Sequence, residues 1–129
     1  MSRIKPSGSA IERSLGSAMF SLGLRYRKQY GIVGRPDFAF PGVKVAVFAD
    51  SDFWHGKDWD RAKREIKSNR VFWITKIERN MRRDGEVVQT LTEGGWLVLR
   101  FWEDEIKKDP LGCALKVKTA VESRRLITD

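Results

Sequence analysis

Two segments of this sequence carry side chains that could together cut a phosphodiester bond. The first is residues 34–38 (GRPDF), and the second is residues 48–55 (FADSDFWH). Such a cut near neutral pH requires a neutralised phosphate charge, an activated water and a stabilised leaving oxygen. A carboxylate with Mg²⁺ and a titratable base can meet all three requirements.

The spacing of these segments fits a metal site at the edge of a sheet. An acid that begins one strand lies close to polar groups that end its hairpin partner. Asp37 follows Pro36 and leads into an otherwise apolar hairpin, so its carboxylate needs a partner. His55 is the only histidine, and its ordinary pKa of about 6.5 suits it to take a proton from water. The two segments therefore indicate metal-assisted hydrolysis.

The elements that must position these side chains follow from apolar periodicity and from turn residues. Predicted are a helix at 10–22, strands at 24–30, 37–40, 43–49 and 96–102, a charged segment at 56–69 that is either a loop or a surface helix, two helices or one kinked helix across 72–93, and a last helix from 110 to about 124. Residues 9–12 (SAIE) have the form of a capping box, and residues 109–110 (DP) form a natural helix start. Pro36 directs Arg35 toward extended geometry.

The composition predicts one compact α/β domain over residues 1–129, since the chain is 41% hydrophobic and too short to divide comfortably. Lysine and arginine number 25 against 17 acidic residues, and the formal charge of +8 makes a polyanion an economical partner. Cys113 is the only cysteine, which excludes an internal disulfide and a cysteine-rich zinc cage, and we assign it no catalytic role. With no apolar signal region or apolar stretch of about 18 residues, we expect a cytoplasmic protein.

Further fragments across residues 1–105 share their order and spacing with one known family. They are 10–12 (AIE), 34–38 (GRPDF), 53–55 (FWH), 72–73 (FW), 76–77 (KI) with Asn80, 83–84 (RD), 95–96 (GW) and 101–103 (FWE). Through them the chain resembles the Vsr-type endonucleases of very short patch repair, within the PD-(D/E)XK nuclease superfamily. The resemblance implies a restriction-endonuclease-like fold, with a central mixed sheet flanked by helices and an active site where the strands of Asp37 and Ala49 end.

The resemblance also implies roles for individual residues. Asp37 would be the carboxylate ligand of a catalytic Mg²⁺, with the backbone carbonyl of Ala49 as a second ligand. His55 would be the general base, and Glu12 an acid near the metal waters, although the capping box alone also accounts for Glu12. Asp50 stands where the family often has a histidine and where many related nucleases have a lysine, so its role as catalytic assistant, metal ligand or water-orienting group is left open.

Candidate contacts to DNA come from two sources. The candidate residues are Phe53, Trp54, Met1, Ile4, Lys76 and Asn80. By resemblance, the aromatic pair forms a wedge in the base stack beside a mismatch, or else it belongs to the core, and the two N-terminal residues help to insert into DNA. Lys76 and Asn80 would be exposed beside a core stripe within 73–81, which suits them to phosphate or base contacts.

One departure from the family concerns its structural zinc, which cysteines and histidine bind. The matching positions read Asp52 and Asp104, so we expect no structural zinc here. The loop after His55 must then be held by other means, such as packing of Trp59 or nearby pairs of Asp and Arg.

We expect a Mg²⁺-dependent endonuclease that acts as a monomer. The resemblance to the Vsr-type family implies that it nicks one strand of double-stranded DNA beside a T·G mismatch. One alternative is a nuclease of the same kind with a sequence- or structure-specific target, in a restriction, phage or mobile-element setting. Another is a DNA-binding module that keeps the fold without the activity. Whether a mismatch-repair mediator protein is a further partner is left open.

Overall fold

The computed structural model describes residues 10–52 and 55–128, and a four-stranded sheet lies at their centre. The strands are β1 (Arg27–Lys28), β2 (Phe38–Phe40), β3 (Val45–Asp50) and β4 (Leu97–Trp102), in that spatial order. Strand β2 runs antiparallel to both β1 and β3, whereas β4 runs parallel to β3, so the sheet is mixed.

The hairpin of β2 and β3 forms the apolar centre of this sheet. Its strands consist almost entirely of valine, alanine and phenylalanine, which suit a sheet covered on both faces, and every residue of β2 is buried. The register pairs Phe38 with Val47 and Phe40 with Val45. The two predicted strands are therefore confirmed, and Asp37, immediately before β2, lies beside the last residues of β3.

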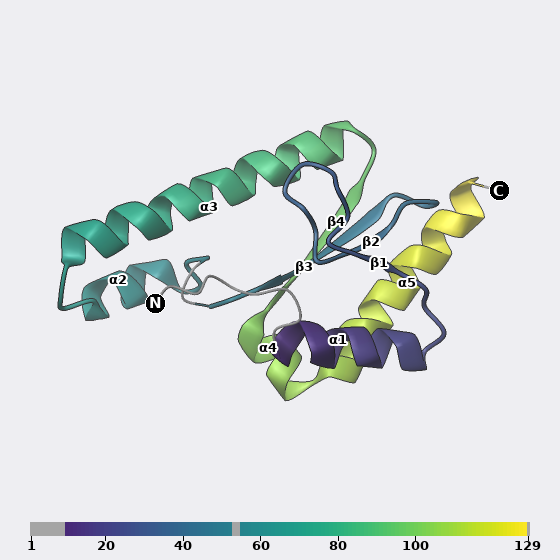
Figure 1. The fold of residues 1–129 in the computed structure, drawn as a ribbon, viewed down its shortest axis with the longest axis horizontal. Helices are drawn as coiled ribbons and strands as arrows, with labels where there is room; N and C mark the ends of the chain where they lie inside the picture. Colours follow the sequence, from purple (N-terminus) through teal and green to yellow (C-terminus); the bar gives the residue numbers. More distant parts are fainter. Residues whose placement is uncertain (1–9, 53–54, 129) are drawn as a thin grey trace.

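Two helices cover one face of the sheet. They are α1 (Ala10–Ser21) and α5 (Pro110–Thr128), which pack against each other (Figure 1). Their buried residues, including Leu15, Met19 and Val117, join the core with the strands. As the sequence predicts, Gly23 ends α1: it has a φ of 84°, and Leu24 N–H donates to the Met19 carbonyl.

The segment between β3 and β4 consists of α2 (Trp59–Glu65) and α3 (Arg70–Glu93). The charged segment is thus a surface helix with no buried residue, and the apolar stripe after it belongs to one long helix that continues through Gly85. Figure 1 shows α3 on the side of the sheet opposite to α1 and α5, with α2 beside the first turns of α3. Only Ile77 and Leu91 of α3 are buried, so most of this helix faces solvent.

Several local predictions differ from the structure. The first strand spans two residues rather than 24–30, and α5 continues to Thr128 rather than ending near 124. Arg35 has a φ of 45° instead of an extended conformation, because its N–H closes a turn onto the Ile32 carbonyl. The short helix α4 (Glu103–Lys108) was not predicted, since Ile106 is its only apolar residue.

The mixed sheet with helices on both faces is the predicted α/β nuclease fold of the restriction-endonuclease type. Within the described residues, no helix has the length and apolar character needed to cross a membrane.

The buried hairpin gives a direct test of the core. Phe38 is fully buried and meets Tyr26 edge to face, with ring centroids 4.8 Å apart. We expect Phe38→Ala to lower the free energy of unfolding by about 3–5 kcal/mol, because it leaves a cavity in the sheet. Chemical denaturation measures this. The control Phe72→Ala removes a side chain that is 58% exposed and should change the free energy by less than about 0.5 kcal/mol. Equal losses in the two variants would contradict this core.

Candidate active site

Asp37 is held at the point where β2 and β3 meet. Its side chain is buried, and its Oδ2 accepts a hydrogen bond of 2.7 Å from the backbone N–H of Ala49. Gln29 Nε2 lies 3.4 Å from the other oxygen. This geometry places the carboxylate beside the residue whose carbonyl was the other predicted metal ligand.

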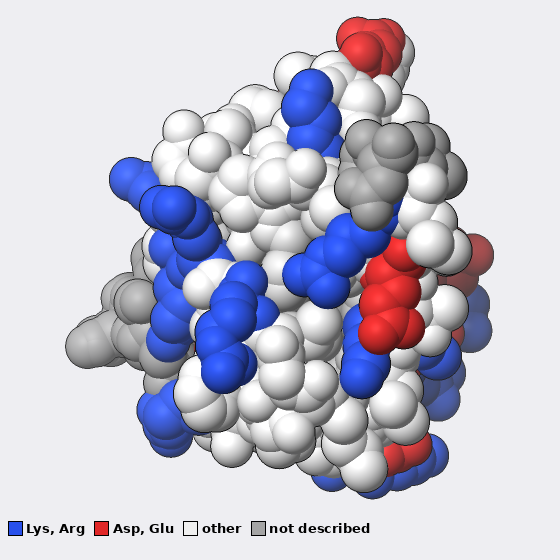
Figure 2. Space-filling view, turned by 90° about the vertical axis from the view of Figure 1, so that its right-hand side faces the viewer, with Lys and Arg blue, Asp and Glu red and all other residues white. Residues whose placement is uncertain are grey.

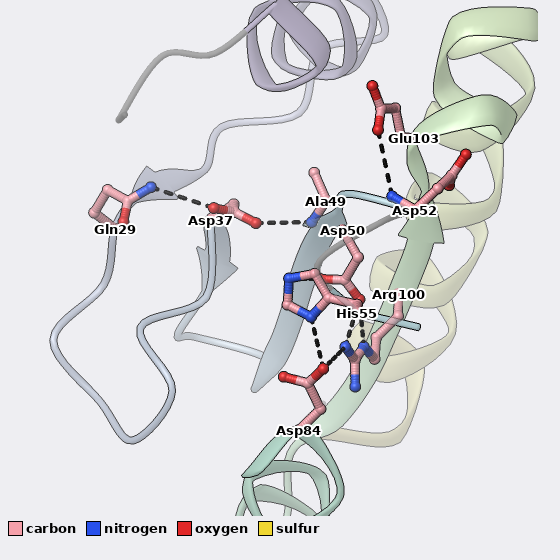
Figure 3. A network of polar contacts seen from close by, with 9 residues as sticks. All are labelled: Gln29, Asp37, Ala49, Asp50, Asp52, His55, Asp84, Arg100 and Glu103. Carbon is pink, nitrogen blue, oxygen red and sulfur yellow. Dashed lines mark hydrogen bonds and ion pairs between the residues drawn. The ribbon is translucent and has the colours of Figure 1, made fainter. Parts of the chain in front are cut away.

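A second group of charged side chains surrounds the end of β3. His55 Nδ1 lies 2.6 Å from Asp84 Oδ2, and His55 Nε2 lies 3.8 Å from Asp50 Oδ1. The Arg100 guanidinium reaches both acids, at 2.5 Å from Asp50 and 3.1 Å from Asp84. Figure 3 shows this network and Asp37 gathered around Ala49 and Asp50, the last two residues of β3.

The charges in this network decide which ring nitrogen of His55 carries a proton. Burial by itself would raise the pKa of Asp84, but the hydrogen bond from His55 and the charge of Arg100 outweigh burial and lower it. Burial by itself would lower the pKa of the Arg100 guanidinium, but the charges and hydrogen bonds of Asp50 and Asp84 outweigh burial and raise it. An ionised Asp84 can only accept hydrogen bonds, so His55 Nδ1 is the donor, and Nε2 is the ring nitrogen that can accept a proton.

The loop that carries His55 is held by contacts on two sides. On the side of α3, Gly56 has a φ of 75° and lies so close to the Met81 sulfur that an added Cβ would collide with it. Trp59 Nε1 on α2 donates to Glu78 Oε2 at 2.9 Å. On the side of α4, Lys57 Nζ lies 2.5 Å from Asp104 Oδ2.

These contacts bear on the expected support for the loop after His55. The expected support from Trp59 takes the form of a hydrogen bond to α3. The charged pairs near the loop are Lys57 with Asp104 and Arg61 with Asp58, the latter 3.6 Å apart. Burial raises the pKa of Asp52, and the nearby Asp104 raises it further. The backbone N–H of Asp52 donates to Glu103 Oε1 at 3.3 Å, which joins the loop to α4 a second time.

The other predicted site residues lie in different settings. Glu12 is buried in the first turn of α1. Lys76 on α3 is exposed as predicted, whereas Asn80, one turn further on, is half-buried. Of the predicted core stripe beside them, Ile77 is buried, and Trp73 and Met81 are half-buried. The predictions for Phe53, Trp54, Met1 and Ile4 fall outside the described residues.

Sequence reasoning missed two members of the network. Asp84 lies in the fragment 83–84 that the family resemblance used, but it was given no role. Arg100 interrupts the apolar strand LVLRFW, and a charge in such a strand is the signal that could have revealed it.

The chemistry of Asp37 fits a magnesium ion. Mg²⁺ usually keeps several waters and is held by one or two carboxylates together with substrate phosphates, rather than by a cage made of protein alone. Among the described residues, no group of three His, Cys, Asp or Glu side chains is placed to form such a cage. The buried carboxylate of Asp37, beside the backbone of Ala49, matches the sparser arrangement that Mg²⁺ prefers.

Comparison with known proteins identifies the family of this chain. The family model described as DNA mismatch endonuclease Vsr matches residues 1–61. The type II nicking enzyme V.NmeDIP of Neisseria meningitidis serogroup C is 55% identical over 94% of this chain and 82% of its own length. The type II nicking enzyme V.HpaIIP of Haemophilus parainfluenzae is 46% identical over 93% of this chain and 86% of its own length. The DNA mismatch endonuclease Vsr of Escherichia coli strain K12 is 35% identical over 80% of this chain and 66% of its own length.

With these relatives, the fold and the site define a DNA endonuclease, a hydrolase of phosphodiester bonds that introduces nicks. The chain belongs to the Vsr family. Nucleases of this family depend on a metal ion, and DNA is their substrate.

The lowered pKa of Asp84 predicts a loss of stability in acid. The pKa of Asp84 in the folded protein lies below its ordinary value of 3.8, so the ionised carboxylate stabilises the fold at any pH above 3.8. This stability is lost as the pH falls through the pKa of the folded state. We therefore expect Asp84→Asn to reduce the fall in Tm between pH 6 and pH 2, values spanning about two units on each side of that pKa. Thermal unfolding across this range measures it. Asp60→Asn, an exposed acid on α2, is the control and should follow the wild-type curve. If the Tm of Asp84→Asn falls with pH as that of the wild type does, the pKa of Asp84 is not lowered in the folded protein.

Proposed function

We propose that this protein is a Mg²⁺-dependent nickase that cuts one strand of duplex DNA beside a T·G mismatch. The observation that carries the chemistry is the gathering of Asp37 and the His55–Asp84 pair around the last residues of β3 (Figure 3). The mismatch target is supported by the family description and by the name of the Escherichia coli relative.

In this proposal each residue has a defined task. Asp37 and the carbonyl of Ala49 hold Mg²⁺, which, when bound, offsets the charge of the scissile phosphate. The Ala49 N–H fixes the direction of the Asp37 carboxylate. His55 accepts a proton from the attacking water at Nε2, and Asp84 orients the ring from Nδ1. Glu12 remains our candidate for an acid near the metal waters.

DNA binding is proposed to depend on general positive charge and on a few placed side chains. Figure 2 shows Lys and Arg side chains spread over the face at the right-hand end of Figure 1, with fewer acidic ones, in keeping with the charge of +8. Lys76 and Asn80 on α3 are the proposed phosphate or base contacts. Phe53 and Trp54 remain the proposed wedge, with Met1 and Ile4 as further inserting residues.

We propose a monomer, because one small domain with one site suits a cut in one strand.

A second candidate is a nickase with a sequence-specific target. It is favoured by the names of the relatives at 55% and 46% identity, which are type II nicking enzymes.

A nicking assay on labelled duplexes separates these candidates. Duplexes of one sequence carry either T·G or T·A at the same place, and each is incubated with Mg²⁺ or with EDTA. The proposal requires nicking of the T·G duplex that needs Mg²⁺. We expect Asp37→Asn to abolish it while duplex binding is kept, because the amide can still accept the Ala49 N–H but carries no charge for the metal. Equal nicking of both duplexes would favour the sequence-specific candidate, and wild-type nicking by Asp37→Asn would remove Asp37 from the site.

His55→Ala tests the general base. We expect it to slow the single-turnover nicking step by about 10²–10⁴-fold, the usual range for the loss of such a group. Duplex affinity should stay close to that of the wild type, because the ring acts on water and not on the DNA backbone. Asp84→Asn should slow the same step less, since the ring is kept and only its orientation is lost. If His55→Ala nicks at the wild-type rate, another group is the base.

A further inference from the structure

Arg100 is a charged residue in the middle of an otherwise apolar strand. Strand β4 reads LVLRFW, and its register places Arg100 opposite Phe48 of β3, whose ring lies 5.8 Å from the guanidinium carbon. The Arg100 side chain is only 28% exposed, so its charge must find partners within the protein.

The first partner of Arg100 is Asp50. This acid is 4% exposed. Its Oδ2 accepts a hydrogen bond of 2.7 Å from Arg100 Nε and forms an ion pair with Arg100 Nη2 at 2.5 Å. A buried carboxylate without such a partner would be strongly destabilising. Arg100 therefore supplies the charge that allows an acid to stand at the end of β3.

The second partner of Arg100 is Asp84. The same Nη2 lies 3.1 Å from Asp84 Oδ2, and this oxygen is also the one that accepts from His55 Nδ1. The guanidinium thus fixes the atom that orients the imidazole. Arg100 acts on the ring of His55 through Asp84, which contacts both side chains (Figure 3).

We propose that Arg100 is a positioning residue for the nicking reaction. It bridges Asp50 and Asp84. Through Asp84 it orients His55 so that Nδ1 donates, and its pairing with Asp50 neutralises the carboxylate that lies 3.8 Å from Nε2, so that Nε2 can accept a proton from water. Asp50 is then the counter-ion of Arg100, which settles for this chain the role that its departure from the family pattern left open. The proposal rests on the proposed role of His55 as base.

The single histidine allows a test that needs neither DNA nor metal. Nitrogen-15 NMR of the imidazole reports the tautomer of His55 alone, because the chain contains no other histidine. In the wild-type protein we expect the neutral ring to carry its proton on Nδ1. In Asp50→Asn/Arg100→Gln, which removes both charges of the buried pair, we expect a mixture of tautomers. A wild-type spectrum in this folded double variant would overturn the proposal.

Nicking kinetics complete the test. At saturating protein, we expect the double variant to lower the single-turnover nicking rate by about 10- to 100-fold, the effect of a misplaced catalytic group, with duplex Kd within about threefold of wild type. Its Tm should stay above that of Arg100→Gln, which leaves Asp50 buried without its guanidinium partner. Arg61→Gln on α2, exposed and paired with Asp58, is the matched control and should nick normally.

Two results would contradict the proposed role of Arg100. A wild-type nicking rate in the double variant would mean that Arg100 only neutralises Asp50. A slowed rate with an unchanged His55 tautomer would mean that Arg100 acts by some other route than the ring. If no variant and no wild-type protein nicks any duplex, the proposed function fails, while the NMR comparison still decides whether Arg100 orients His55.

Discussion

The requirement that a buried charge be partnered governs the centre of this molecule. Asp37 and Asp50 lie at the end of an apolar sheet, and each finds its partner on a neighbouring strand: Asp37 on the backbone of β3, and Asp50 on Arg100 of β4. A shift of one residue in either strand pairing would separate these partners and turn apolar side chains to the wrong face. The register of the sheet and the arrangement of the site are therefore one constraint.

Much of this arrangement could be predicted from the sequence, and the missing part has a physical reason. The apolar runs in β2, β3 and β4 predicted their strands, and the proximity of Asp37 to Ala49 followed from hairpin geometry. The link from Asp50 to Arg100 joins residues 50 positions apart and depends on the parallel pairing of β3 with β4. No local pattern contains that pairing. The helix α4 was missed for the opposite reason, because six mostly charged residues leave almost no periodicity to detect.

The loop after β3 is held in place by ordinary contacts to the helices around it. Lys57 pairs with Asp104 of α4, the ring nitrogen of Trp59 reaches Glu78 of α3, and Gly56 allows close contact with Met81. Each contact is worth little alone, since exposed ion pairs contribute weakly to stability. Their value lies in position: they hold the loop from two helices, and so they restrict where His55 can lie.

The parallel pairing of β3 and β4 also has a consequence for folding. The hairpin of β2 and β3 joins residues close in sequence, whereas the pairing of Val45 with Leu97 closes a loop that contains all of α2 and α3. Loop-closure entropy makes such long-range pairing slow, so we expect β4 to join the sheet after the hairpin has formed. Until it does, Asp37 is in place but Arg100 and Asp84 are not. A newly made chain would therefore complete the network around His55 only once β4 has joined the sheet.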